Sequence, residues 1–230
     1  QGFPFHFEWH LASFYTGSFL ALFNPFAILC GLLSVALSVY MGCAMLMIRG
    51  EGELYARARG FLDRSALAAL ALFTLGGIWV VFLDGYQLVQ GPAPGVAQTP
   101  LQQEVVRASG AWLDNFLAMP LLWLVPGLAY LGLAAGRWGA LNHRPQLAWW
   151  LGALAWIGVI GTVGAAMFPF MMPSSAEPSH SLTVWNASSS EYTLMWMLGF
   201  TVVFMPLILW YTIWAFWVMR GKVSAKHVEA

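Results

Sequence analysis

The chain has 230 residues, of which 60% are hydrophobic and only 9% are charged, and its formal net charge is zero. A soluble domain carries about 25% charged residues, because polar side chains must cover its surface. This composition excludes a soluble globular protein, and the zero net charge offers no basic surface for binding nucleic acid. We therefore expect a protein that faces lipid.

Five stretches contain no Asp, Glu, Lys, Arg or His and are long enough to cross a hydrocarbon layer about 30 Å thick. In chain order they are residues 24–48, 65–83, 115–136, 145–172 and 192–219. All ten acidic, ten basic and five histidine residues lie outside these stretches. The predicted fold is therefore all-α, a polytopic bundle of five transmembrane helices.

The segments between the spans differ in character. In segment 1–23, aromatic and other residues alternate over residues 2–10, a period of two that predicts an extended strip at the membrane interface. Segment 84–114 contains a Pro/Gly-rich run at 91–95, followed by a predicted short helix at 101–109. Segment 173–190 is rich in Ser and Pro. We expect these three segments to be external loops.

The basic residues predict the orientation, because Lys and Arg gather on the cytoplasmic side of a membrane. Nine of the ten lie in connections 49–64 and 137–144 and in the tail 220–230. The remaining one, Arg107, lies in segment 84–114. The C-terminus is therefore predicted to be cytoplasmic and, with five helices, the N-terminus external.

The predicted spans offer little chemistry. Haem in a helix bundle usually needs an axial His or Met, and a proton path through lipid needs ionisable groups. The spans contain no His or acid, and a Met in an apolar helix is more often a packing residue than a ligand. We predict that this chain binds no haem or metal and carries no catalytic residue. Pro120, Pro126, Pro169 and Pro206 interrupt the spans and are expected to kink them.

Small residues at four-residue spacing predict where helix backbones approach one another closely. Ser34, Ser38 and Gly42 form such a row on the first span, and Gly132 and Gly136 form one on the third. Close approach of backbones at small residues is common between membrane helices.

Four charged residues in the external segment 84–114 are candidate structural or subunit-interface residues: Asp84, Glu104, Arg107 and Asp114. If residues 101–109 are helical, Arg107 lies on one face with both Glu104 and Asp114. Two interpretations remain open. The set is either a solvated group of ion pairs worth little energy, or a partly buried clamp that fixes the loop where a partner subunit docks.

Several sequence runs resemble subunit II of the cytochrome bd-type quinol oxidases, and the resemblance extends over essentially the whole chain in order. The runs are Tyr15-Thr16-Gly17, Leu22-Phe23-Asn24-Pro25-Phe26, Gly52-Glu53-Leu54, Asp84-Gly85-Tyr86, Glu104-Val105-Val106-Arg107, Gly110-Ala111-Trp112-Leu113, Met167-Phe168-Pro169-Phe170, Met172-Pro173-Ser174-Ser175, Ser181-Leu182-Thr183-Val184-Trp185, Tyr211-Thr212 and Met219-Arg220-Gly221.

The resemblance implies a subunit with about eight helices, of which this sequence would contain the fourth to the eighth. It implies a bacterial inner-membrane complex that oxidises a quinol from the quinone pool and reduces O2 to water. Haem b and haem d, with the quinol site, would lie in the partner, subunit I. This chain would complete the complex and shield the haems from membrane lipid.

Other classes remain as alternatives. The chain could be a fragment of a solute permease, a structural membrane subunit of another complex, or a haem protein in its own right. A permease would transport solute into vesicles without a second subunit, and a haem protein would show a visible absorption spectrum alone. No residue of the spans points to either activity.

We predict the topology from the bias of nine basic residues against one. Reporter fusions at Arg57, Arg144 and Lys226 should report the cytoplasm, and fusions at Gly95 and Ser179 should report the outside. A cytoplasmic signal from the Gly95 fusion would overturn this map.

Overall fold

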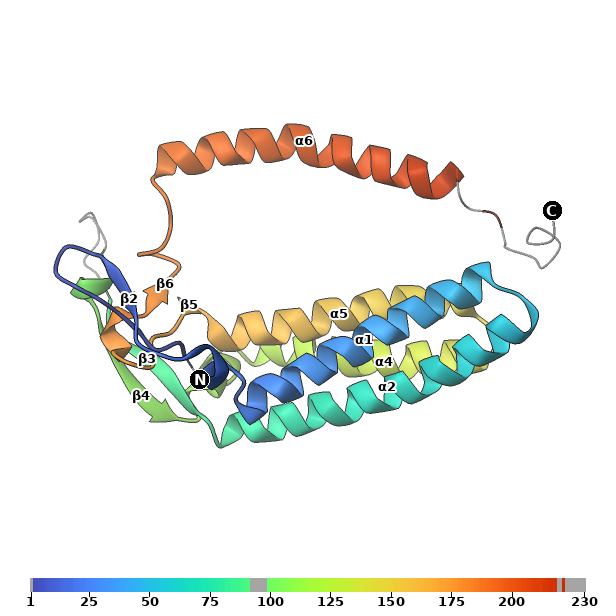
Figure 1. Ribbon diagram of the computed structural model, residues 1–230, viewed down its shortest axis with the longest axis horizontal. Coiled ribbons are helices and arrows are strands. Elements are labelled where there is room, and N and C mark those ends of the chain that lie inside the picture. Colours follow the sequence, from blue (N-terminus) through green and yellow to red (C-terminus); the bar gives the residue numbers. More distant parts are fainter. Residues whose placement is uncertain (1, 92–98, 219–220, 222–230) are drawn as a thin grey trace.

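The computed structural model describes residues 2–91, 99–218 and 221. In this part of the chain five helices are long and apolar enough to cross a membrane, as predicted. Four of them lie side by side in a bundle, and the fifth stands apart (Figure 1). The five are α1 (Pro25–Arg49), α2 (Gly52–Val81), α4 (Leu124–Leu141, extended by the 3-10 turn η4, Pro120–Trp123), α5 (Pro145–Met167) and α6 (Glu191–Val218).

Two helical hairpins, α1–α2 and α4–α5, make the bundle, and Tyr40 joins them. Tyr40 on α1 is fully buried and its hydroxyl donates a hydrogen bond to the backbone oxygen of Ala148 on α5, at 2.8 Å. A Cβ atom at Gly136 or Gly152 would collide with the Tyr40 ring or hydroxyl. Both glycines therefore form the slot that this side chain occupies.

The backbones of α4 and α5 approach each other closely at glycines. A Cβ atom on Gly132 would lie 2.6 Å from the backbone oxygen of Leu151 and 2.7 Å from the nitrogen of Ala155. The predicted close contact at Gly132 and Gly136 is thus confirmed. The contact predicted on α1 is not made within the described part of the chain, because Ser34, Ser38 and Gly42 are exposed there.

The second helix begins earlier than the span predicted at 65–83. It begins at Gly52 and runs for 30 residues, or about 45 Å, which exceeds the roughly 30 Å thickness of a hydrocarbon layer. Its first four turns carry Arg57, Arg59, Asp63 and Arg64. The long helices therefore extend beyond the charge-free stretches and include charged residues near their ends, as they also do at Arg137 in α4, Arg49 in α1 and Glu191 in α6.

Two prolines end helices where kinks were predicted. The span predicted at 115–136 is divided into α3 (Asp114–Ala118), η4 and α4, because a proline cannot donate the backbone hydrogen bond and disfavours helix in the residue before it. That residue, Met119, has φ −128° and ψ 87°. The span predicted at 145–172 ends at Met167, and Phe168–Pro169 is a cis peptide bond. Pro206 does lie within α6.

Strands gather at one end of the bundle, which we call the strand end (Figure 1). The all-α class is therefore incomplete, although the extended strip predicted near the N-terminus is present. Three antiparallel two-stranded sheets lie there: β1 (Phe5–Phe7) with β2 (Ser13–Tyr15), β3 (Asp84–Gln90) with β4 (Glu104–Ser109), and β5 (Phe170–Met172) with β6 (Leu182–Thr183). The short turns η2 (Pro100–Gln102) and η5 (Pro178–His180) lie between paired strands, whereas η1 (Phe19–Leu22) leads from β2 to α1 and η3 (Ala111–Leu113) from β4 to α3.

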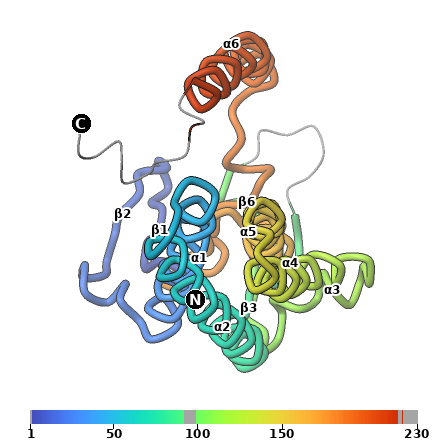
Figure 2. The backbone as a smooth tube through the Cα atoms, turned by 90° about the vertical axis from the view of Figure 1, so that its right-hand side faces the viewer, coloured from blue at the N-terminus to red at the C-terminus, as the bar shows by residue number. Residues whose placement is uncertain are grey.

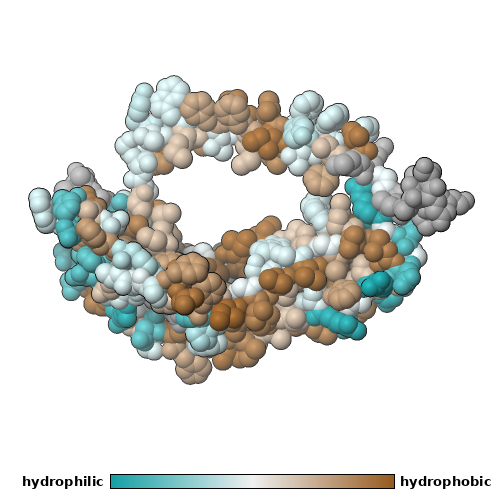
Figure 3. Space-filling model, viewed as in Figure 1, coloured by the Kyte–Doolittle hydropathy of each residue, from teal (hydrophilic) through white to brown (hydrophobic). Residues whose placement is uncertain are grey.

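The opposite end carries the α1–α2 and α4–α5 connections, and we call it the arginine end, defined by residues 49–64 and 137–147. Figure 3 shows hydrophilic side chains at both ends of this face of the molecule and hydrophobic ones over the middle of the bundle and on α6. This distribution is that of a protein whose middle faces lipid. Arg220, Lys222 and Lys226 of the predicted tail, the run 92–95 and the last residue of the predicted fifth span lie outside the described residues.

Helix α6 lies apart from the bundle in both views (Figures 1 and 2). It contains no buried residue, although it is uniformly apolar. Its aromatic rings contact one another along one side at four-residue spacing, from Tyr192 through Trp196 and Phe200 to Phe204. An apolar helix that packs against nothing would expose its side chains to water. The surroundings of α6 are therefore lipid or other protein.

The Gly132 contact generates a stability prediction. Gly132→Ala should destabilise the folded protein by about 1–3 kcal/mol, because the added methyl group meets backbone atoms that cannot rotate away. Gly127→Ala, on the same helix, is the control, because a Cβ atom there meets nothing within 4 Å. Thermal unfolding in detergent would measure both, and equal midpoints for the two variants would contradict the close contact.

Candidate functional site

The four charged residues predicted at the external segment lie at the strand end, but not on one helical face. Residues 104–109 form strand β4, not the predicted helix, so Glu104 and Arg107 point to opposite faces of the strand. Asp84 begins β3 and Asp114 begins α3. The structure therefore does not bring Arg107 and the three acids together as a set.

Arg107 contacts an aromatic ring and a backbone oxygen. Across the β3–β4 pair it lies opposite Tyr86, with its guanidinium carbon 5.5 Å from the centre of the Tyr86 ring. Its Nη2 atom donates a hydrogen bond to the backbone oxygen of Ser175, at 2.5 Å. No carboxylate in the described ranges forms an ion pair with Arg107. The side chain thus links the hairpin to the loop after β5.

The three acids have separate positions. Asp114 accepts a hydrogen bond from Gln87 Nε2 at 2.5 Å, which ties the start of α3 to strand β3. Asp84 is exposed and, with Leu83, Tyr86 and Arg107, lines a small hollow of about 180 Å³. Glu104 is exposed at the start of β4, opposite Gln90.

Tyr86 is the buried centre of this region. Its side chain is 4% exposed and packs against Trp112 and Phe170, with ring centres 5.7 and 6.1 Å away. Burial raises the pKa of the Tyr86 hydroxyl, while the charge and hydrogen bond of Arg107 act in the opposite direction. Tyr86 therefore stays neutral at physiological pH and serves as a packing and hydrogen-bonding group.

The N-terminal segment closes over the Tyr86 hydroxyl. Phe3 donates its backbone N–H to Pro173 O at 2.9 Å and accepts from Ser175 N at 2.8 Å. Gly2 has φ +78°, and a Cβ atom there would collide with the Tyr86 hydroxyl. Three segments distant in sequence, residues 2–5, 84–109 and 173–175, thus meet around Tyr86.

A second group at this end, absent from the sequence predictions, is a buried polar network. Gln103 Nε2 donates to the backbone oxygens of Ser179, at 3.1 Å, and Ser181, at 2.5 Å. Asn186 Nδ2 donates to Gln103 Oε1 at 3.1 Å, and Ser181 Oγ accepts from Ser174 N at 2.9 Å. Gln103, Ser174 and Ser181 are buried. Single polar residues in loops show no sequence periodicity. The sequence therefore indicated this network only through the Ser-rich composition of segment 173–190.

A third group, which the sequence did not predict, lies at the arginine end. Arg137 Nε on α4 and Asp63 Oδ1 on α2 form an ion pair of 2.6 Å. Both side chains are about one-third exposed. Sequence analysis placed both residues in loops, so their meeting across two helices was not foreseen.

These arrangements hold loops in position at both ends of the bundle. No His, Cys, Asp or Glu side chains gather in groups of three within the described part of the chain. At the strand end the polar contacts instead satisfy backbone groups of loops that have no regular structure. The strand end is thus a hydrogen-bonded cap on the bundle.

Comparison with known proteins gives the family. The sequence model of the family described as "Cytochrome bd terminal oxidase subunit II" matches residues 1–219. The chain belongs to this family. It is thus a multi-pass protein of the inner membrane, in agreement with its five apolar helices.

Individual relatives agree with this family. The chain is 40% identical to the "Cytochrome bd-I ubiquinol oxidase subunit 2" of Escherichia coli (strain K12) over 233 residues, which cover 100% of this chain and 61% of the relative. It is 39% identical to the "Probable cytochrome oxidase subunit 2" of Haemophilus influenzae, with the same shares covered. The similarity to the "Cytochrome bd ubiquinol oxidase subunit 2" of Bacillus subtilis is 35% and covers 44% of this chain and 30% of the relative. The chain thus spans about three-fifths of the length of the first two of these relatives.

In this subunit II family member, the contacts around Arg107 predict an intermediate loss of stability when the Arg107 side chain is removed. Arg107→Ala should cost about 1–2 kcal/mol, because it loses one charge-assisted hydrogen bond and an exposed cation–π contact but leaves no buried acid unpaired. Arg107→Lys should recover part of this loss, since it keeps the charge but not the forked geometry.

The measurement is thermal unfolding together with the yield of assembled protein. Glu104→Ala is the matched control and should change stability by less than about 0.5 kcal/mol, because Glu104 is exposed on the other face of β4. An Arg107→Ala variant that unfolds at the wild-type temperature would contradict the role of Arg107 in holding the loop.

Proposed function

We propose that this chain acts as subunit II of a quinol:O2 oxidoreductase, in which a haem-bearing subunit I oxidises quinol and reduces O2 to water. The observation that carries the proposal is the similarity over 100% of the chain to a ubiquinol oxidase subunit. In this proposal the chain completes the complex and shields the haems of the partner from lipid. Its own side chains do no redox chemistry.

The positions of the histidines support a subunit without its own haem. His6 and His10 lie at the strand end near β1, and His180 lies in η5. His143 follows α4 at the arginine end. His227 is outside the described residues. None of the four described histidines lies on a long helix, where an axial ligand would reach a haem inside a bundle. Haem b and haem d are therefore assigned to the partner.

The surface supports a partner as well as lipid. Large apolar side chains cover α6 throughout, and the aromatic residues Trp9, Phe14 and Phe19 are exposed at the strand end. Exposed apolar areas of this extent belong in lipid or in a protein interface. We assign the strand end, with Asp84, Glu104, Arg107 and Asp114, to the outer surface of the membrane as the candidate docking region for subunit I.

The arginine end is assigned to the cytoplasm. Arg49, Arg57, Arg59 and Arg64 lie on α1 or α2, and Arg137 and Arg144 lie at the other hairpin. Arginines enriched beside the ends of membrane helices indicate the cytoplasmic side. The N-terminal strand β1 is then external.

Purification of the natural full-length protein through an affinity tag tests the proposal. We expect it to bring down a second membrane subunit with b-type and d-type haem absorption, and the complex to consume O2 with an added quinol. The tagged subunit produced alone should show no haem band above background. A haem spectrum from the subunit alone, lost when a helix Met is changed to Leu, would assign haem to this chain and refute the proposal.

A further inference from the structure

A histidine at the strand end joins the N-terminal hairpin, formed by β1 and β2, to the turn η5. The turn between the two strands carries Trp9, which is 87% exposed. His180 in η5 is 173 residues away from Phe7 in sequence, yet the two rings pack together with their centres 6.3 Å apart. The His180 side chain is only 15% exposed. The contact between the hairpin and η5 is therefore largely shielded from solvent.

The hydrogen bond between Phe7 and His180 fixes the protonation state of the imidazole ring. The backbone N–H of Phe7 donates to His180 Nδ1 at 3.0 Å. A backbone N–H can only donate, so Nδ1 carries no hydrogen and the neutral ring has its hydrogen on Nε2. Turning the ring over would place a carbon atom against the N–H and leave it without an acceptor. The contact therefore exists only in the neutral form of His180.

A second partner for His180 lies close to the same nitrogen. Glu177 Oε2 is 3.7 Å from His180 Nδ1. A protonated imidazole carries a hydrogen on both nitrogens, so Nδ1 can then donate to the carboxylate but can no longer accept from Phe7. Uptake of one proton therefore replaces the backbone partner of His180 with an acid.

The other elements that pack against η5 supply no competing charge. Strand β4 carries Glu104 and Arg107, and η2 carries no charged residue. The Arg107 guanidinium lies over the Tyr86 ring, and Glu104 is exposed. Neither forms an ion pair with His180 in the described ranges.

The titratable side chains of the hairpin contact one another or its own rings. Glu8 and His10 form a pair of 3.5 Å in the exposed turn. His6 stacks on the Phe14 ring, with the centres 5.9 Å apart. These contacts lie within the hairpin and do not join it to η5.

The start of the hairpin has a separate attachment that does not titrate. Ser174 Oγ donates a hydrogen bond to the backbone oxygen of Phe5, whose side chain is 5% exposed. Loss of the Phe7 contact therefore frees the outer part of the hairpin, residues 7–15, while its start remains bound.

We propose that His180 is a pH-sensitive latch for the N-terminal hairpin. Neutral His180 holds Phe7 against η5, and protonated His180 pairs with Glu177 and releases residues 7–15. The attachment is present at higher pH and is lost as the pH falls through the titration of His180, and histidine side chains ordinarily titrate between about pH 5 and 8. The inference does not depend on the oxidase activity, because it rests only on contacts within the strand end.

Hydrogen–deuterium exchange of the natural full-length protein, with the subunits that purify with it, tests the latch. The exchange rate of the Phe7 amide is corrected for the chemical exchange rate at each pH. It should be about fivefold faster at about pH 5.5 than at about pH 7.5, the effect of losing one hydrogen bond of ordinary strength. Amides of the β3–β4 pair should exchange equally at both pH values.

Three variants separate the hydrogen bond from the titration. His180→Asn places an amide oxygen where Nδ1 lies, so it accepts from Phe7 but does not titrate, and exchange should be slow at both pH values. His180→Ala removes the acceptor, so exchange should be fast at both. Glu177→Gln should move the release to lower pH by roughly 0.3 to 0.7 pH units, because the protonated ring loses the carboxylate of a partly exposed ion pair.

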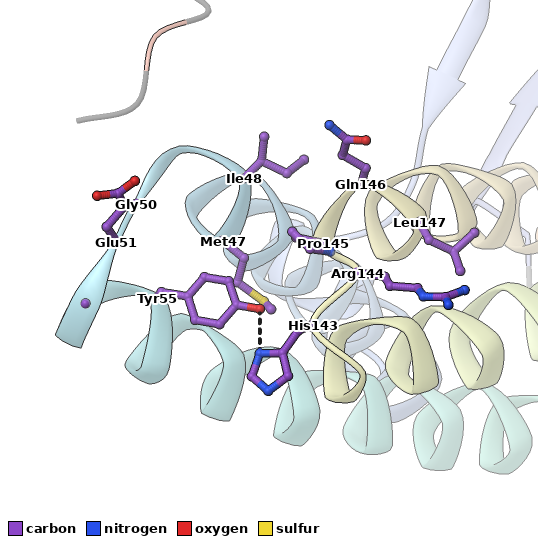
Figure 4. Close-up of a pocket in the computed structure, with 11 residues that line it drawn as sticks. Met47, Ile48, Gly50, Glu51, Tyr55, His143, Arg144, Pro145, Gln146 and Leu147 are labelled. Carbon is purple, nitrogen blue, oxygen red and sulfur yellow. Dashed lines mark hydrogen bonds between the residues drawn. The ribbon is translucent and has the colours of Figure 1, made fainter. Parts of the chain in front are cut away.

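Histidines outside the latch supply matched controls. His143 lies at the arginine end, where its Nδ1 atom is 3.2 Å from the Tyr55 hydroxyl beside a cavity of about 770 Å³ (Figure 4). His10 lies in the turn of the hairpin itself. The variants His143→Asn and His10→Asn should both keep the wild-type pH response of the Phe7 amide.

The proposal is overturned if the Phe7 amide exchanges equally at both pH values, if His180→Asn keeps the pH response, or if His10→Asn or His143→Asn removes it. A wild-type release pH in Glu177→Gln would also overturn the switch of partners. The Glu177 side chain is 58% exposed, so this variant should fold and give an answer even where a His180 variant lowers the yield.

Discussion

The hydrogen bond from Tyr40 to the backbone of Ala148 is the contact on which the bundle depends. A hydroxyl within a bilayer has no water to bind, so it must find an acceptor inside the protein. Tyr40 finds it on α5 only because Gly136 and Gly152 leave space for its ring. One side chain therefore fixes the distance between the two helical hairpins, and with it the position of both ends of the bundle.

The same requirement explains the construction of both ends. Where a chain leaves regular structure, its backbone groups need other partners. At the strand end Gln103 and Arg107 supply donors to carbonyl groups of the loop that follows β5. At the arginine end Arg59 Nη2 donates to the backbone oxygen of Leu141, at 2.8 Å, which ties the end of α4 to α2. Polar side chains at both ends thus act mainly on backbone, which is consistent with the structural role proposed for this subunit.

The contrast between the bundle and α6 bears on that role. The bundle buries a continuous core, whereas α6 buries nothing and keeps large aromatic and aliphatic side chains on all sides. Close packing of helices in lipid relies on small residues and shape, since lipid is as apolar as the side chains. The outward row of Ser34, Ser38 and Gly42 on α1 offers such a surface. These two surfaces are suited to packing against other membrane helices.

The sequence by itself determined the number of long apolar helices, the division between apolar middle and charged ends, and the family. These follow from hydropathy over about twenty residues and from sequence runs, which are local properties. The sequence did not determine that residues 104–109 form a strand, because that depends on pairing with β3. It also did not determine that α2 begins at Gly52, because a helix can continue beyond the apolar stretch that crosses the lipid. The Tyr40 slot, the Asp63–Arg137 pair and the cavity beside Tyr55 each join residues more than 70 positions apart. Only the packing of one hairpin against the other decided them, because each needs a partner that the local sequence does not contain.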